Sequence, residues 1–361
     1  MITGRLSRYF GWKFLGAVAA VFGGALVLIA MVDFIEMLRR TSDKEVSALF
    51  VARITFYRVP FITERVMPFA ILIGAMSCYL NLSRRLELVV ARAAGISAWQ
   101  FIAPVLALAM VLGVMATTLY NPVSAALREQ SVRLEAEVFG GADSYQDFGS
   151  GFWVRQRSED GQAIINSKAS RQQGSLLSAV SIFRYDLSGH FRDRIEAKSA
   201  LLRPGFWHLE EARIYANGVP PADFRTYDVR TNLTPAQVRE SFATPETVPF
   251  WQLSSYIQLA ESAGLAAAAY RLQYYQLLVL PFYLGSMVLL AAAVSLRFFR
   301  FGGVQKMVLS GIGGGFLLYV LAKITGDLSK AGLMPAVVAA SFPAMAAGLT
   351  GVITLLYQED G

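Results

Sequence analysis

Long apolar tracts and one extended polar segment alternate along the chain, and this alternation predicts its architecture. A membrane-spanning helix needs about 20 predominantly apolar residues. Such tracts occur at residues 14–32, 54–82, 96–127, 272–296, 307–322 and 333–357. The sequence therefore predicts six transmembrane helices, three before the polar segment and three after it. The first tract is too long for the apolar region of a signal peptide, so we expect it to be retained as the first helix.

The polar middle segment carries the period-2 pattern of half-buried strands. Phe191, Ile195 and Leu201 share one face of a predicted strand, and charged residues share the other. Ser188-Gly189 before this strand is a turn signal. Short strands with turns about every ten residues predict an antiparallel sandwich or jelly roll. We therefore divide the chain into residues 1–127 with the first three helices, 128–265 with the β domain and its linkers, and 266–361 with the last three helices.

The charge balance fits a membrane protein. Only 16% of the 361 residues are charged and 55% are hydrophobic, whereas soluble domains are about 25% charged. The formal net charge is +7, but residues 128–271 hold 16 Lys and Arg against 17 Asp and Glu. The excess positive charge therefore belongs to the apolar parts. A nucleic-acid-binding protein needs a basic surface on a soluble domain, so we expect no nucleic-acid partner.

The sequence offers no arrangement of residues that fits a catalytic, metal or nucleotide site. Cys78 is the single cysteine and lies in an apolar tract. His190 and His208 have no cysteine or carboxylate cluster beside them that could complete a metal cage. Residues 302–306 lack the spacing of a Walker A loop. We therefore expect a non-enzymatic chain without a cofactor, in which any ATP hydrolysis belongs to another chain.

Basic residues at the far ends of the first two helices depart from the usual topology rule. With the N-terminus in the cytoplasm, nine Lys and Arg lie on the cytoplasmic side and eight near the opposite side, although basic residues favour the cytoplasm. Five of these eight form a candidate lipid-phosphate site: Arg39, Arg40, Arg53, Arg58 and Arg65. Guanidinium groups pair bidentately with phosphate. The alternative is that they only anchor helix ends at the headgroup level.

Acidic side chains lie close to these arginines in the sequence. Asp33 and Glu36 close the first helix, and Glu64 lies at the edge of the second. Charges at membrane depth are costly and mark a paired or functional site. The alternative is again a headgroup-level anchor, because each residue is near a helix end.

Residues 84–95 join the second and third helices and predict a short amphipathic helix. Leu86, Val89, Val90 and Ala93 fall on one apolar stripe, and Gly95 is a C-terminal stop. Such a helix lies on the bilayer or docks into a partner. Glu87 among basic residues favours a protein partner. The residues that we assign to docking are Arg84, Arg85, Glu87, Val90 and Gly95.

These segments resemble the lipopolysaccharide-export permeases of the LptF/LptG type. The likeness rests on Arg84–Gly95, on Asp33–Arg40 at the end of the first helix and on Tyr319–Asp327 in the fifth. It covers the whole chain, and the start of the fourth helix at Tyr270–Gln276 is more similar to LptG than to LptF. The resemblance implies a permease subunit of an ABC transporter in the bacterial inner membrane. It would extract lipopolysaccharide and pass it to a periplasmic bridge toward the outer membrane.

The resemblance also implies an orientation and partners. Both termini would be cytoplasmic, and the inserted domain would be a periplasmic antiparallel β-jelly roll. The partners would be an LptF-like permease paralogue, a dimeric cytoplasmic LptB-like ATPase that binds ATP and Mg, a membrane-anchored LptC-like protein, an LptA-like bridge and lipopolysaccharide.

Residue roles follow from the same resemblance. Glu87 and its helix would contact the ATPase. Arg39 and Arg40 would face the lipid A phosphates or inner-core sugars, and Phe316 and Tyr319 would line the cavity wall. The family often has a basic residue where this chain has Asp33, so no lipid-binding role is carried over to that position.

Two other functions compete with this interpretation. A lipoprotein- or macrolide-type ABC permease fits less well because it usually has four spans. A membrane-anchored scaffold or sensor would use the extracytoplasmic β domain to bind a ligand without transport. The predicted docking helix separates these hypotheses, because a scaffold has no need of an ATPase.

Overall fold

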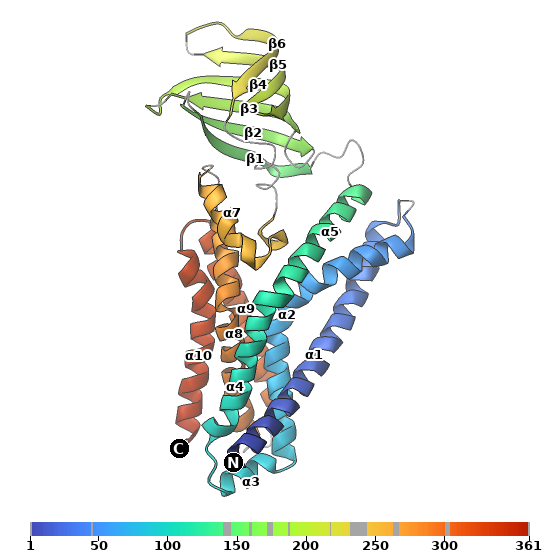
Figure 1. Ribbon diagram of the computed structural model, residues 1–361, viewed down its shortest axis with the longest axis vertical. Helices are drawn as coiled ribbons and strands as arrows, with labels where there is room; N and C mark the ends of the chain where they lie inside the picture. Colours follow the sequence, from blue (N-terminus) through green and yellow to red (C-terminus); the bar gives the residue numbers. More distant parts are fainter. Residues whose placement is uncertain are drawn as a thin grey trace. The chain divides into compact units, whose positions relative to one another are not determined.

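The computed structural model describes residues 2–44, 46–139, 146–158, 161–171, 176–186, 188–216, 218–231, 244–262, 267–299 and 304–359. The chain divides into two compact units (Figure 1). The helical unit comprises Met1–Ser131, Pro249–Leu253 and Ala268–Gly361. The β unit comprises Val132–Val248 and Ser254–Ala267.

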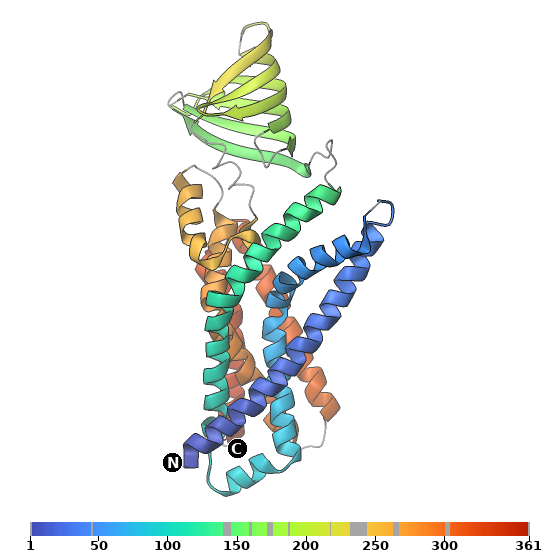
Figure 2. The same cartoon turned by 45° about the vertical axis from the view of Figure 1, so that its right-hand side comes forward.

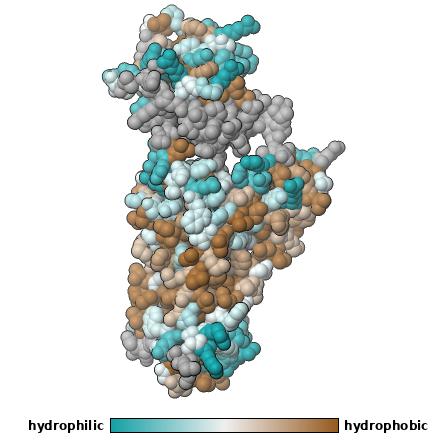
Figure 3. All heavy atoms as spheres, viewed as in Figure 1, coloured by the Kyte–Doolittle hydropathy of each residue, from teal (hydrophilic) through white to brown (hydrophobic). Residues whose placement is uncertain are grey.

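Six helices among the described residues are long and apolar enough to cross a membrane, as the sequence predicts. They are α1 (Ile2–Arg40), α2 (Ala48–Arg84), α4 (Ala98–Met115) with its continuation α5 (Asn121–Phe139), α8 (Ala268–Phe299), α9 (Val304–Lys330) and α10 (Ala336–Glu359). The third helix is longer than its apolar tract, because a π-helical turn at Ala116–Tyr120 joins α4 to the more polar α5. Figure 3 shows the apolar side chains of this unit between its two ends, where hydrophilic ones gather.

Helices α2 and α8 form the centre of the helical unit. In α2 and in α8, 61% of the most apolar stretch of the helix is buried. The corresponding share is 22% in α9 and none in α1. Close approach of α4 to α8 depends on Gly113, where a Cβ atom would lie 2.4 Å from the Cα of Pro281. Helix α2 carries Pro60 and Pro68 and is visibly bent (Figure 2), because proline removes a backbone donor and crowds the preceding turn.

The β unit contains one six-stranded antiparallel sheet whose strand order follows the sequence. Its strands are β1 (Gln146–Ser158), β2 (Gly161–Arg171), β3 (Leu176–Tyr185), β4 (Phe191–Arg203), β5 (Phe206–Ala216) and β6 (Ala222–Arg230). The prediction of an inserted antiparallel β domain is confirmed. The described strands form a meander, whereas the crossed connections of a jelly roll would place non-consecutive strands side by side.

One face of this sheet forms the core of the β unit. Ile165, Ile182, Ile195 and Leu209 are fully buried, and Trp207 is 1% exposed. Burying an aliphatic side chain of this size contributes about 1.5–3 kcal/mol. This apolar face accounts for the alternating sequence pattern.

The prediction that Ile195 and Leu201 share one face of β4 is wrong. The core holds Ile195, but further along the strand it holds Ala200 and Leu202 in place of Leu201. The ladder to β3 passes from Ala197 to Ser199 without a pair at the residue between them. This irregularity shifts the alternation by one position. Phe191, predicted on the same face, is 41% exposed.

Three helical segments complete the described chain. Helix α3 (Glu87–Ala93) is the short helix predicted between the second and third spans. A 3₁₀ turn at Pro245–Thr247 precedes α7 (Phe250–Ser262), which the sequence analysis did not identify.

Candidate functional site

The α3 segment is built by two backbone turns of unusual conformation. Helix α2 ends at Arg84, and Leu86 adopts a left-handed φ of 58° that redirects the chain into α3. After α3, Gly95 has a φ of 81°, where glycine avoids the steric cost that other residues pay. A non-glycine residue in the left-handed region costs about 1–2 kcal/mol, and the buried neighbours Leu82 and Leu88 hold the chain on either side of this turn.

Helix α3 has two apolar faces with different roles. Leu88 and Ala91 are buried in the helical unit, whereas Leu86 is 57% and Val90 66% exposed. The predicted stripe that contains Leu86 and Val90 therefore points away from the rest of the chain. This leaves an apolar surface on a turn between two transmembrane helices.

Charged groups surround this exposed apolar surface. Arg84 and Arg85 are exposed, as is the backbone at Gly95. The hydroxyl of Tyr9, on α1, donates a hydrogen bond to Oε1 of Glu87 at 3.2 Å. The structure thus places all five predicted docking residues on one turn and ties Glu87 to α1.

Arg39 and Arg40 lie at the end of α1, and both pair with Glu36. The guanidinium of Arg39 donates to both carboxylate oxygens of Glu36, at 3.0 and 3.1 Å. Nε of Arg40 donates to Oε1 of the same residue at 2.9 Å. The side chains of Arg39 and Arg40 remain 77% and 55% exposed. Exposed ion pairs of this kind contribute only about 0–1 kcal/mol, so a bidentate phosphate can compete with Glu36.

Arg58 has a different environment from the other predicted lipid ligands. Its Nε lies 3.3 Å from Oδ1 of Asp33 on α1, and the two side chains are only 23% and 9% exposed. Its NH1 group also contacts the sulfur of Met37 at 3.4 Å. This partly buried pair joins α2 to α1. Its geometry supports a structural role for Arg58 more than direct lipid contact.

Arg53 borders an aromatic hollow on the first turns of α2. The hollow has a volume of about 450 Å³ and is lined by Ser47, Leu49, Phe50, Ala52, Arg53, Phe56 and Tyr57. The Arg53 guanidinium lies 5.7 Å from the centre of the Tyr57 ring. Leu49 is 82% and Phe56 68% exposed. A cation beside exposed apolar and aromatic side chains suits a membrane–water interface.

The remaining predicted lipid residues lie elsewhere in the helical unit. Arg65 stacks over the ring of Phe61 at 4.4 Å. On α9, Phe316 is 61% and Tyr319 47% exposed, and the Tyr319 ring is 6.0 Å from that of Phe69 on α2. The seven predicted lipid residues therefore form separate groups along α1, α2 and α9.

A polar cluster around the π-helical turn links four helices, and the sequence analysis identified only its carboxylate. Glu64 on α2 accepts hydrogen bonds from Nδ2 of Asn121 at 2.8 Å and from the hydroxyl of Ser124 at 2.7 Å. Oδ1 of Asn121 accepts from the backbone N–H of Phe250, at the start of α7, at 2.9 Å. The ring of Phe250 stacks on Tyr274 of α8, with centres 5.6 Å apart. Asn121 thus connects Glu64 on α2 to the start of α7.

The neighbouring turn adds two more links. The Thr117 hydroxyl donates to the carbonyl of Leu277 on α8 at 2.8 Å, and the Trp251 indole donates to the carbonyl of Thr118 at 3.2 Å. A π-helical turn leaves carbonyls available for such contacts and often occurs at functional positions. The functional signal in the sequence was the charge of Glu64 alone, because its partners are distant in the chain.

The described residues contain no group of three or more His, Cys, Asp and Glu side chains that could hold a metal ion. Nδ1 of His208 lies 2.6 Å from a carboxylate oxygen of Asp228, and Cys78 is a free, buried thiol.

Comparison with known proteins identifies the family of the chain. Residues 8–357 match the family described as lipopolysaccharide export system permease LptF/LptG. The chain belongs to the LptF/LptG family. It is 24% identical over 353 residues to the lipopolysaccharide export system permease protein LptG of Escherichia coli strain K12, covering 94% of each chain. It is also 24% identical over 351 residues to the Haemophilus influenzae protein of that name, covering 94% of this chain and 95% of the relative.

Membership of the LptF/LptG family indicates which membrane the six helices span. The chain is a multi-pass protein of the inner membrane and a permease of lipopolysaccharide export. As a permease it is a transport subunit and not a catalytic one.

Proposed function

We propose that this LptF/LptG family member is the LptG-like half of an ABC exporter. It pairs with an LptF-like paralogue, takes lipopolysaccharide from the inner membrane and passes it to an LptA-like periplasmic bridge through an LptC-like protein. A dimeric LptB-like ATPase binds ATP and Mg and docks on the cytoplasmic side. Both termini then lie in the cytoplasm and the β unit in the periplasm.

The observation that carries this proposal is the exposed apolar face of α3. Leu86 and Val90 are largely exposed at a turn where the chain also presents Arg84 and Arg85. A soluble partner with an apolar groove would bury this face, whereas the chain itself already covers the opposite face through Leu88 and Ala91. Amphipathic helices that dock into grooves use this division of faces.

Replacing Val90 with a charged residue tests the docking surface. Val90→Glu should reduce the amount of ATPase that co-purifies with the full chain from native membranes by about tenfold or more, because it places a carboxylate in an apolar contact. Val219→Glu is the matched control, since Val219 is similarly exposed, at 63%, in the β unit. Mass spectrometry of the purified chain measures the bound ATPase.

The charged residues of the α3 turn provide a second test of docking. A combined Arg85→Ala and Glu87→Gln substitution should also abolish ATPase association if this is a transporter half. A membrane-anchored scaffold or sensor would be unaffected. If the wild-type chain brings down no ATPase, the transport proposal fails and the scaffold interpretation replaces it.

We also propose that Arg39, Arg40 and Arg53 contact the phosphates of the lipid. All three arginines are exposed, at the end of α1 and near the start of α2. Guanidinium groups pair bidentately with phosphate. Phe316 and Tyr319 offer exposed aromatic surface on α9 for the acyl part of the same cargo.

Charge reversal tests the lipid contact. Arg39→Glu combined with Arg40→Glu should lower lipopolysaccharide photocrosslinking from a probe at Ile35 several-fold, with unchanged expression, because like charges repel phosphate. Lys330→Glu is the control, since Lys330 is exposed at the end of α9. Unchanged crosslinking would reduce Arg39 and Arg40 to topology anchors.

A further inference from the structure

A row of irregular pairing crosses the β unit from β2 to β6. Each of the four ladders pairs the residues on both sides of this row but not the row itself. The omitted residues, one on each strand, are Lys168, Ala179, Lys198, Glu211 and Arg225. Five neighbouring strands therefore interrupt their pairing at the same level, which isolated defects would not do.

Burial along the strands shows the same interruption. On β3 the buried positions pass from Leu177 to Val180, and on β5 from Leu209 to Ala212. In both strands the spacing increases from two residues to three. The register is the same on both sides of the row, so no extra residue is inserted, but the alternation of buried and exposed side chains shifts by one position there. The strand β4 departs from its predicted alternation at this level too.

Two residues of the row have a costly backbone conformation. Ala179 and Glu211 both have a φ of 51° although neither is glycine. This conformation is strained for a non-glycine residue, and such strain tends to be retained at binding and catalytic sites. A sheet that only needed to bend could place glycine at these positions.

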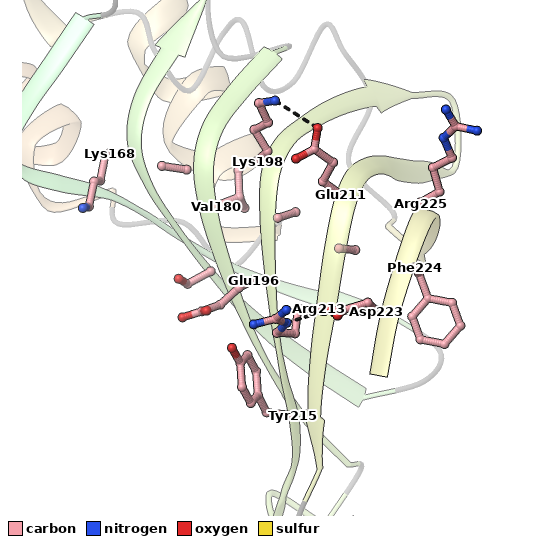
Figure 4. Close-up of a pocket in the computed structure, with 14 residues that line it drawn as sticks. Lys168, Val180, Glu196, Lys198, Glu211, Arg213, Tyr215, Asp223, Phe224 and Arg225 are labelled. Atoms are coloured by element: carbon pink, nitrogen blue, oxygen red, sulfur yellow. Dashed lines mark hydrogen bonds and ion pairs between the residues drawn. The ribbon is translucent and has the colours of Figure 1, made fainter. Parts of the chain in front are cut away.

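The row forms part of a groove with a volume of about 710 Å³ (Figure 4). Charged pairs line it. Nζ of Lys198 lies 2.9 Å from Oε1 of Glu211, and Arg213 donates to both carboxylate oxygens of Asp223. The Glu211 carboxylate raises the pKa of Lys198, and the Arg213 guanidinium lowers the pKa of Asp223. The lining thus combines fixed donors with fixed acceptors.

Two basic side chains border the groove at its ends. Lys168 on β2 and Arg225 on β6 form no ion pair with another described residue. Four strand spacings separate β2 from β6, which is about 19 Å along the row. Tyr215 on β5 and Phe224, next to Arg225 on β6, add aromatic surface to the lining, and Phe224 is 42% exposed.

We propose that this groove binds a phosphorylated oligosaccharide. Sugar hydroxyls both donate and accept hydrogen bonds, which matches the paired charges of the lining. Apolar sugar faces fit Tyr215 and Phe224, and phosphate groups fit Lys168 and Arg225. An acidic peptide would supply few donors for Glu211 and Asp223. The proposal rests on the proposed function, since the transported lipopolysaccharide would carry such a phosphorylated saccharide.

Direct binding to the full chain in detergent tests the groove. The probe is deacylated lipopolysaccharide saccharide with its phosphates intact, measured by isothermal titration calorimetry. Lys168→Ala combined with Arg225→Ala should weaken binding by about tenfold or more, because two charge-assisted contacts are lost. Arg192→Ala combined with Arg203→Ala is the control, because both are exposed basic residues of β4 that do not line the groove. The control should bind as the wild type does.

Three further ligands separate the alternatives. The dephosphorylated saccharide should bind much more weakly, and inorganic phosphate alone should bind weakly as well. Equal binding of the dephosphorylated form, equal binding of phosphate alone, tighter binding of a polyglutamate peptide, or no effect of the Lys168 and Arg225 substitutions would each overturn the proposal. These outcomes leave ATPase co-purification unaffected, so failure here is distinct from failure of the transport proposal.

Discussion

At the scale of the residue, the side chain of Asn121 joins segments of the helical unit that are far apart in the sequence. Its amide donates to Glu64 and its carbonyl oxygen accepts from the N–H of Phe250. An unsatisfied polar group inside a bundle costs about 1–3 kcal/mol, and Asn121 supplies a partner to each of these two groups. One side chain therefore fixes both α2 and the start of α7 to the π-helical turn.

Changing Asn121 to aspartate separates its two contacts. Asn121→Asp retains an oxygen for the N–H of Phe250 but replaces the donor to Glu64 with a second carboxylate. We expect a loss of stability of about 1–3 kcal/mol, seen as a lower thermal unfolding midpoint in detergent. Hydrogen exchange at the first amides of α7 should change little in this variant and rise in Asn121→Ala.

Ser124→Ala is the matched control for this pair of substitutions. It removes one donor to Glu64 but leaves Asn121 in place, so its effect should be smaller, about 0.5–1.5 kcal/mol. An Asn121→Asp protein that is as stable as the wild type would show that Glu64 does not need its amide donor.

The sequence allowed some of these residues to be predicted. A carboxylate at the edge of a span indicated a paired or functional site, and Glu64 is indeed paired. Its partners could not be found, because Asn121 and Ser124 are 57 and 60 residues away and only tertiary packing brings them near. Asp33 and Arg58 show the same limit, since nothing local in the sequence links α1 to α2 at these positions.

At the scale of the element, α3 is a short helix held between two turns with left-handed backbone. Seven residues are too few for a stable isolated helix, so α3 depends on the packing of Leu88 and Ala91 and on its ends. Gly95 provides the exit turn with a φ of 81°, and a Cβ atom there would meet nothing within 4 Å. Only backbone conformation, and no steric contact, therefore requires glycine at this position.

Replacing Gly95 tests how far the exit turn sets the position of α3. Gly95→Ala should destabilise the segment by about 1–2 kcal/mol, measured as faster hydrogen exchange of the α3 amides. It should also weaken ATPase association, because the exposed face loses its fixed orientation. Gly23→Ala is the control, since a Cβ atom there also meets nothing within 4 Å, but in a regular part of α1. Unchanged exchange in Gly95→Ala would contradict the prediction.

Elements were more predictable than their details. The apolar tracts and the period-2 pattern identified the six spanning helices and the strands, because burial of side chains sets both patterns. The shift within β4 was missed, since nothing in the sequence of this one strand marks the position where the pairing of five strands is interrupted. Helix α7 was missed because its polar and apolar residues mix in a short segment.

At the scale of the whole molecule, the helical unit leaves α1 and α9 with large apolar surfaces. Val32 on α1 is 60% and Leu317 on α9 is 68% exposed, whereas Met287 on α8 is fully buried. Lipid tails can cover such apolar surfaces, and a second permease chain can cover them as well. The exposure of whole helix faces fits a subunit that functions in an assembly.

Cysteine labelling measures which of these faces is covered. In the purified complex, Val32→Cys and Leu317→Cys should lose reactivity to a bulky maleimide, because a second permease chain covers them. In the isolated chain both should react. Met287→Cys should stay unreactive in either state, and equal labelling in the complex and in the isolated chain would indicate that only detergent or lipid covers these faces.

The strand order of the β unit bears on how the chain is made. Every described strand pairs with its neighbours in sequence, so each hairpin can close as soon as its second strand has been synthesised. No contact within the sheet waits for a distant segment, and proteins with such local contacts fold fast. The inserted domain can therefore complete its sheet while the last three membrane helices are still being synthesised.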